Sequence, residues 1–284
     1  MSTMTTTSDH SAAGSARPRR LRQIRAVTAL ALRDRLTLVG VVAAAMVAMG
    51  ALTGALWPPL QDTLVALPAN FTDSVGKLLA GADMTTPAGW MNAEMVSLVV
   101  PGGLIAVAIL SASKAICGEE QTKTIGVLLS LPLSRSAFLA AKTAAMIVHV
   151  LLATLGVAAG LIIGNVIGGL GIDASGVFGT CAHSALLAIV FGAVAVLIAA
   201  LTGDGRLASA IPAALAVLAF ALNAFLPLSD SLAGFTKVSP WYYFAGSNPL
   251  VNGVNYADLS ILLVAAIVLC ALAFPVYHRR DLAG

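Results

Sequence analysis

The chain has 284 residues, of which 58% are hydrophobic and only 10% are Asp, Glu, Lys or Arg, against about 25% charged residues in a soluble domain. With a mean hydropathy of +0.92, it has too few charges to cover a folded surface in water, whereas a bilayer requires an apolar exterior. These numbers exclude a soluble enzyme, a disordered chain and a secreted disulfide scaffold, and the net charge of +3 favours lipid headgroups over nucleic acid as the anionic partner.

The N-terminal segment is rich in Ser, Thr, Ala and Arg and has no apolar core of a signal peptide. We expect residues 1–20 to be a disordered cytoplasmic tail that is not cleaved. Within residues 21–32, Leu21, Ile24 and Val27 share one helical face, which predicts an interfacial helix leading into the first membrane span. A disordered basic arm would carry the same charges, so both interpretations stay open at this point.

Six stretches without Asp, Glu, Lys or Arg follow, and each reaches about the 20 residues that a helix needs to cross the hydrocarbon core of a bilayer. We therefore expect an all-α, polytopic membrane protein with six transmembrane helices in one domain, residues 21–284. The predicted helices cover residues 36–57, 94–116, 136–168, 180–202, 207–228 and 258–277.

The distribution of cations predicts the orientation, because basic residues are retained on the cytoplasmic side of a membrane. With the N-terminus inside, all but two of the 16 Lys and Arg residues fall on cytoplasmic segments. Only Lys77 and Lys237 fall outside. The sequence therefore predicts that both termini are cytoplasmic.

The inner loop between the second and third predicted helices carries an amphipathic pattern. We expect Gly118 to end the second helix. Ile125 and Leu128 then share one face of a short helix that Pro132 ends, and Ser134 can cap the next helix. The pattern alone does not separate a helix that contacts a partner from an amphipathic hairpin lying on the inner leaflet.

Three segments resemble a known family. Residues 118–135, Gly-Glu-Glu-Gln-Thr-Lys-Thr-Ile-Gly-Val-Leu-Leu-Ser-Leu-Pro-Leu-Ser-Arg, followed by Leu139 and Lys142, resemble the loop between helices two and three of ABC-2 type exporter permeases. The segment Ser239-Pro-Trp-Tyr-Tyr-Phe is similar to that family's outer segment before the last helix, and Arg279-Arg-Asp is similar to its closing residues.

The resemblance implies that this loop holds a coupling helix docked on a separate ATPase subunit. Two permeases, either two copies or a copy and a paralogue, would then assemble with two ATPases. ATP and magnesium would bind the partner, so no cofactor is expected on this chain, which also lacks a GxxxxGK[ST] phosphate-binding loop. Carried over to this sequence, the ATPase-facing residues are Glu119, Glu120, Thr124 and Leu128, and the residues that set the turn are Pro132, Ser134 and Arg135.

Two further patterns concern the spans themselves. Glycines repeat every four residues along the third predicted helix and form a smooth face for close helix packing, at Gly156, Gly160, Gly164 and Gly168. Polar residues in the spans are scarce, and Ser111, Asn165 and Asn223 are candidate polar groups of a translocation pathway. Such scarcity favours an apolar or amphipathic cargo such as an antibiotic, a peptide or a lipid.

We interpret the chain as the permease subunit of an ATP-binding cassette exporter in a bacterial inner membrane, without enzymatic activity of its own. One alternative is a secondary transporter, although the six stretches contain no charged residue that could carry ions. Another is a non-transporting anchor subunit of a respiratory or signalling complex. His149 and His183 lie toward opposite faces of the membrane, which disfavours a haem site in such an anchor.

Overall fold

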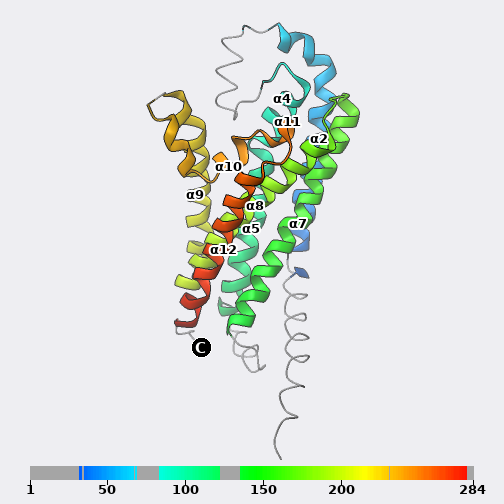
Figure 1. Cartoon of the computed structure of the whole chain (residues 1–284). Coiled ribbons are helices and arrows are strands. Elements are labelled where there is room, and N and C mark those ends of the chain that lie inside the picture. Colours follow the sequence, from blue (N-terminus) through cyan, green and yellow to red (C-terminus); the bar gives the residue numbers. More distant parts are fainter. Residues whose placement is uncertain are drawn as a thin grey trace, which may run out of the picture.

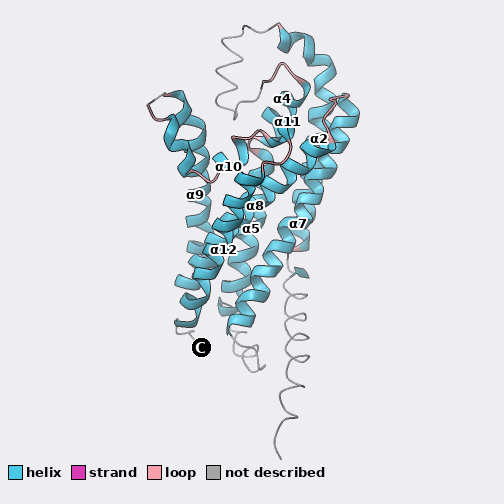
Figure 2. Cartoon of the chain, viewed as in Figure 1, coloured by secondary structure: helices cyan, strands magenta, loops and turns pink. Residues whose placement is uncertain are grey.

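The computed structural model describes residues 32–33, 35–66, 68, 83–121, 135–229 and 231–279, with the side chains at 118–121 excepted. Within these ranges all regular elements are helices, which confirms the all-α prediction (Figure 2). The predicted N-terminal tail, almost all of the predicted interfacial helix and loop residues 122–134 lie outside the described ranges.

The described part of the chain contains six helical spans that are long and apolar enough to cross a membrane, as predicted. They are α2 (Leu36–Val65); α4 (Pro87–Met91), the π-helical η1 (Asn92–Val96) and α5 (Val99–Gln121), which form one span; α7 (Arg135–Gly168); α8 (Ala174–Thr202); α9 (Gly205–Phe225) with the 3-10 turn η2 (Leu226–Leu228); and α12 (Tyr256–Arg279). Between α9 and α12 lie the short helices η3 (Ala233–Val238), α10 (Tyr242–Ala245) and α11 (Pro249–Asn252).

The helix ends follow local sequence signals. Thr86 caps α4, because its hydroxyl accepts a hydrogen bond from the Gly89 backbone N–H, and Pro87 occupies the first helical position. Gly203 ends α8 in the left-handed conformation with φ 66°, and the side chain of Asp204 caps α9 by accepting from the Arg206 N–H. This two-residue connection makes α8 and α9 antiparallel neighbours.

The helices α5 and α8 form the centre of the bundle (Figure 1). In each of them 67% of the most apolar window is buried, against 22% in α2 and α9 and 17% in α12, so the outer helices present most of their length to lipid. α2 lies along α7, α12 packs on α8, and α9 contacts α5 and α8 at the edge of the bundle. α4, α10 and α11 lie at one end, the α10 end, and the C-terminal end of α12 lies at the other (Figure 1).

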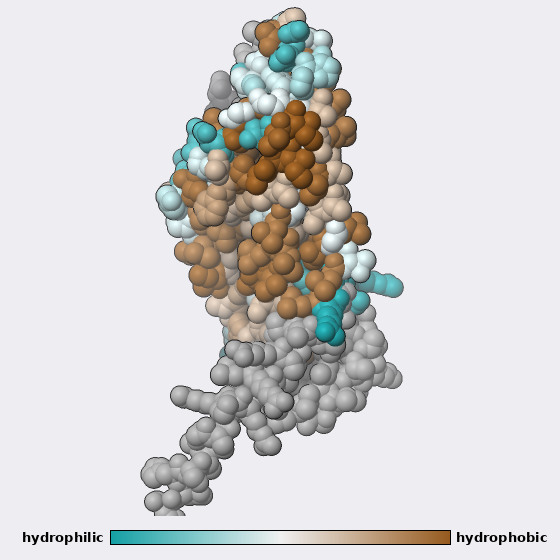
Figure 3. Space-filling view, turned by 90° about the vertical axis from the view of Figure 1, so that its right-hand side faces the viewer, coloured by the Kyte–Doolittle hydropathy of each residue, from teal (hydrophilic) through white to brown (hydrophobic). Residues whose placement is uncertain are grey.

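The surface agrees with a membrane environment. In Figure 3 a broad apolar band covers the middle of the molecule, and hydrophilic residues lie both above it and at its lower border. Large exposed side chains such as Val166, Val217 and Val264 belong to this exterior. The chain is therefore built with its apolar residues outside as well as inside, as the composition requires.

Helices α2, α5 and α8 run further than expected, and α8 begins at Ala174 instead of at residue 180. α5 continues through Gly118 to Gln121, so the expectation that Gly118 ends the helix is wrong. A single glycine costs a helix about 1 kcal/mol, which the buried part of α5 outweighs. α2 continues through Pro58 and Pro59 to Val65.

Candidate functional site

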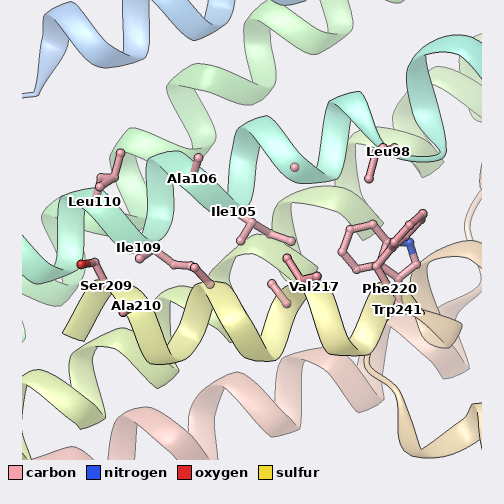
Figure 4. A pocket seen from close by; sticks show the side chains of 13 residues that line it. Leu98, Ile105, Ala106, Ile109, Leu110, Ser209, Ala210, Val217, Phe220 and Trp241 are labelled. Atoms are coloured by element: carbon pink, nitrogen blue, oxygen red, sulfur yellow. The ribbon is translucent and has the colours of Figure 1, made fainter. Parts of the chain in front are cut away.

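A cavity with a volume of about 660 Å³ lies between α5 and α9 (Figure 4). It is open at one side, where its lining residues Val217 and Leu98 are 69% and 49% exposed. This volume falls within the range of about 300–1,000 Å³ that is typical of small-molecule sites. The cavity runs along both helices, from Ser209 at one end to Phe220 and Trp241 at the α10 end. Its wall consists of Leu98, Gly102, Ile105, Ala106, Ile109 and Leu110 before and on α5, the α9 residues Ser209, Ala210, Ala213, Ala216, Val217 and Phe220, and Trp241.

Small residues on both helices leave this space unfilled. A Cβ atom added at Gly102 would meet no atom within 4 Å. The next residue, Gly103, faces a different side of α5, where an added Cβ would collide with the Met46 side chain of α2. The face of α5 toward α2 is therefore closely packed at Gly103, whereas the face toward α9 is open at Gly102.

The chemistry of the cavity is almost entirely apolar. Among the residues that the structure describes, no charged side chain lines it, and the Ser209 hydroxyl already donates to the Gly205 carbonyl of its own helix at 2.9 Å. Binding here would depend on dispersion and on the removal of apolar surface from water or lipid headgroups. The lining therefore fits an apolar ligand of drug size.

Aromatic side chains form the wall at the α10 end. The rings of Phe220 and Trp241 are 5.2 Å apart at 66°, and Trp241 meets Phe244 at 6.2 Å and 89°. These are edge-to-face arrangements, which stabilise an aromatic pair beyond the area that it buries. Trp241 is 3% exposed, so the packed rings close the cavity at this end.

A second close contact joins α7 to α2. The glycines of α7 face α2 in parallel order, and a Cβ added at any of them would come closer than 3.0 Å to an α2 backbone atom. Gly50 and Gly54 of α2 belong to the same contact. The α7 residues and the α2 residues opposite them are Gly156 and Ala43, Gly160 and Met46, Gly164 and Gly50, and Gly168 and Gly54.

Residues 24–278 match the family model of the multidrug efflux system permease Rv1217c, C-terminal domain. The chain belongs to this family. It is therefore a transporter permease and a multi-pass membrane protein, in agreement with its six apolar spans. No individual curated protein matches the chain.

Of the residues predicted to couple the permease to an ATPase, Arg135 is the one whose side chain the structure describes. Glu119 and Glu120 belong to the last turn of α5, whereas Thr124, Leu128, Pro132 and Ser134 lie outside the described ranges. Arg135 is the first residue of α7, and its Nη1 lies 3.4 Å from the His278 carbonyl of α12.

The beginning of α7 also packs against the end of α12. The rings of Phe138 and Tyr277 stack with centroids 6.3 Å apart, and Tyr277 is 2% exposed. Lys142, the last residue of the segment that resembles the coupling loop, is a buried residue of α7, and its Nζ lies 5.2 Å from the centre of the Phe138 ring. Movement at the start of α7 would therefore reach α12 directly.

None of the three polar residues expected in a pathway lines the cavity of the permease. Ser111 is buried on α5 and its hydroxyl has no partner. Asn165 instead closes the α7–α8 turn, because its amide both donates to and accepts from the Ile172 backbone at 2.9 Å. Asn223 lies partly buried near the end of α9.

The residues of the cavity that sequence reasoning missed are Gly102, Phe220 and Trp241. In retrospect, Gly102 and Ala106 of α5 and Ala210 and Ala213 of α9 are small residues at helical spacing. The same spacing of small residues occurs throughout this alanine-rich chain, so it did not mark a cavity. Among the described residues no cluster of His, Cys, Asp and Glu could hold a metal ion.

Proposed function

We propose that this permease is the membrane subunit of an ATP-binding cassette exporter of the ABC-2 type, located in a bacterial inner membrane. It takes apolar compounds into the cavity between α5 and α9 and releases them at the α10 end, which faces outside. The observation that carries the proposal is this drug-sized cavity, which no charged residue lines in the described part of the chain, in a member of an efflux permease family.

Two features of the sequence support an ATP-driven mechanism. Residues 118–142 resemble the coupling loop of ABC-2 type permeases, and the chain has no phosphate-binding loop of its own. An ATPase can drive the permease only through a contact whose free energy differs between two transporter states. In the proposed complex Glu119 and Glu120, at the end of α5, make this contact together with Thr124 and Leu128, while Pro132, Ser134 and Arg135 set the turn into α7.

The proposed orientation follows from the charges. Lys237 lies in η3 at the α10 end, whereas Arg135 and Arg279 lie at the beginning of α7 and the end of α12. Because cytoplasmic segments retain basic residues, the end with most cations faces the cytoplasm. Both termini are then cytoplasmic, and the α10 end with its aromatic residues lies at the outer headgroups.

Reconstitution tests this function. The purified permease is placed in proteoliposomes with and without a Walker-type ATPase encoded next to it, and efflux of a membrane-soluble aromatic dye is followed. We expect ATP-dependent efflux only with both subunits, because this chain has no phosphate-binding loop. Efflux that needs no ATPase but follows a proton gradient would identify a secondary transporter instead.

Charge reversal tests the coupling contact. We expect Glu119→Arg combined with Glu120→Arg to leave the permease folded but to separate the ATPase or uncouple its hydrolysis from efflux. Loss of a buried ion pair costs about 3–5 kcal/mol, against about 0–1 kcal/mol for an exposed pair. Asp62→Arg, near the C-terminal end of α2, combined with Asp73→Arg in the predicted outer loop, is the matched control and should change neither. Full assembly and efflux in the Glu119 and Glu120 variant would favour an amphipathic hairpin on the inner leaflet.

A further inference from the structure

The chain folds back after α9 and meets α9 again at the α10 end of the cavity. After η2 and η3, the hydroxyl of Ser239 donates to the Ala219 carbonyl at 2.7 Å, across 20 residues of sequence. Ser239 is 1% exposed, so this hydrogen bond is protected from water. The bond therefore fixes the returning segment to a definite turn of α9.

The same hydroxyl also holds the backbone of Trp241. The Trp241 N–H donates to the Ser239 Oγ at 3.2 Å. Ala219 directly precedes Phe220, whose ring meets the Trp241 ring at 5.2 Å. One hydroxyl group therefore places the Trp241 ring against Phe220, at the end of the cavity (Figure 4).

Little else attaches this segment to α9. Among the described residues from 229 to 245, every other hydrogen bond joins residues no more than six positions apart, the longest being from the Tyr243 hydroxyl to the Lys237 carbonyl. Phe235 and Val238 of η3 are 61% and 75% exposed, so η3 itself buries little surface. Trp241 is thus tied to α9 by one long-range hydrogen bond and by the contacts of its ring, while α10, which follows it, packs on α8 and α12.

We propose that Trp241 is the movable outer wall of the cavity and that Ser239 is the positioning residue that keeps this wall closed. The inference rests on the proposed function for the direction of export, in which cargo leaves the cavity at the α10 end, between Phe220 and Trp241. A buried hydrogen bond changes the equilibrium between the closed and the open position of the Trp241 wall by about two- to tenfold. This is enough to favour the closed position while the open position remains accessible. The alternative is a permanent wall, with cargo leaving sideways between α5 and α9.

Thiol labelling distinguishes these routes. Cys117, Cys181 and Cys270 are first replaced, and Ala216→Cys places one thiol in the cavity, at a residue that is 7% exposed. A membrane-impermeant maleimide is then added outside intact cells, and the labelling rate is measured. We expect Ser239→Ala to raise this rate about two- to tenfold, since it removes the bond that closes the wall. Ser239→Thr retains the hydroxyl and should label at the parental rate.

Two matched variants distinguish movement of the Trp241 wall from a general loosening of the protein and from an inverted orientation in the membrane. Ser260→Ala removes an equally short bond, 2.7 Å to the Ala257 carbonyl, on the exposed side of α12, and should leave labelling of Cys at position 216 unchanged. Lys237→Cys reports the orientation and should be labelled from outside in every background. Unlabelled Lys237→Cys would refute the proposed direction of export.

The wall inference itself is overturned if position 237 is labelled but Ser239→Ala does not change labelling at position 216. If Ser239→Ala fails to fold, Trp241→Leu provides the same test, because it shortens the wall while the bond from Ser239 to Ala219 stays. An unchanged rate in that variant overturns the inference equally. Since labelling requires no ATP, this result is independent of the ATPase.

Discussion

Replacement of Gly160 by alanine measures how much the close contact between α2 and α7 contributes to the stability of the folded permease. The new Cβ would come closer than 3.0 Å to the Met46 carbonyl, whereas ordinary contacts of a Cβ begin at 3.4 Å. The added methyl group would meet backbone atoms of α2, which no change of rotamer can move away, so the two helices must separate at this point. A gap of roughly 1 Å forfeits up to about half of the dispersion energy of the contacts that it opens.

Two effects of opposite sign determine the result. Overpacking of this kind costs about 1–3 kcal/mol, whereas glycine to alanine inside a helix gains about 1 kcal/mol from helix propensity. Gly102→Ala makes the same chemical change on α5, where an added Cβ meets nothing within 4 Å. The gain in helix propensity cancels when the free energies of unfolding of the two variants are compared. We expect Gly160→Ala to be less stable than Gly102→Ala by about 1–3 kcal/mol.

The assay is equilibrium unfolding of the purified permease in detergent micelles, with helicity as the signal and both variants compared with the parent. Gly40→Ala is a second control, because Gly40 lies on α2 itself and an added Cβ there also meets nothing within 4 Å. Equal stabilities of the Gly160 and Gly102 variants would refute the reasoning, since they would show that α2 and α7 accommodate a methyl group without separating.

Two other predictions use the same preparation. Asn165→Ala should lower the free energy of unfolding by about 1–3 kcal/mol, because it leaves the Ile172 N–H and carbonyl unpaired. Binding of the dye should not change in this variant. Altered dye binding without lost stability would instead place Asn165 in the translocation pathway. Gly102→Phe should fill the cavity and weaken binding of an apolar aromatic dye about tenfold or more, with little change in stability. The control Gly40→Phe should leave the cavity open and dye binding unchanged. Undiminished dye binding in the Gly102 variant would exclude the cavity as the binding site.

The sequence predicted the number of spans because crossing a bilayer requires a minimum apolar length, and this requirement can be read from each stretch separately. The ends of helices depend on competing terms. Gly118 is a reasonable end for a helix, yet α5 continues to Gln121 because burial of the preceding turns outweighs the local cost of glycine. Boundaries were therefore less predictable than the number of helices.

The candidate site was harder to predict, because it depends on which helix faces each residue. Gly102 and Gly103 are adjacent and chemically identical, but one faces an empty space and the other faces Met46 of α2. Asn165 is polar and lies in a span, yet it serves the α7–α8 turn. Sequence distance likewise concealed the bond between Ser239 and Ala219, because nothing local in either segment indicates that they meet.

The paired helices α2 and α7 are longer than a bilayer is thick. With 30 and 34 residues, they extend about 45 and 51 Å, against a hydrocarbon core of about 30 Å. Because the glycine contacts join their backbones, the two helices must tilt or protrude together when the membrane becomes thinner or thicker. Met46 of α2 touches Gly103, the residue beside the cavity wall at Gly102, so such a tilt would press on α5. Bilayer thickness would thereby act mechanically on the cavity itself.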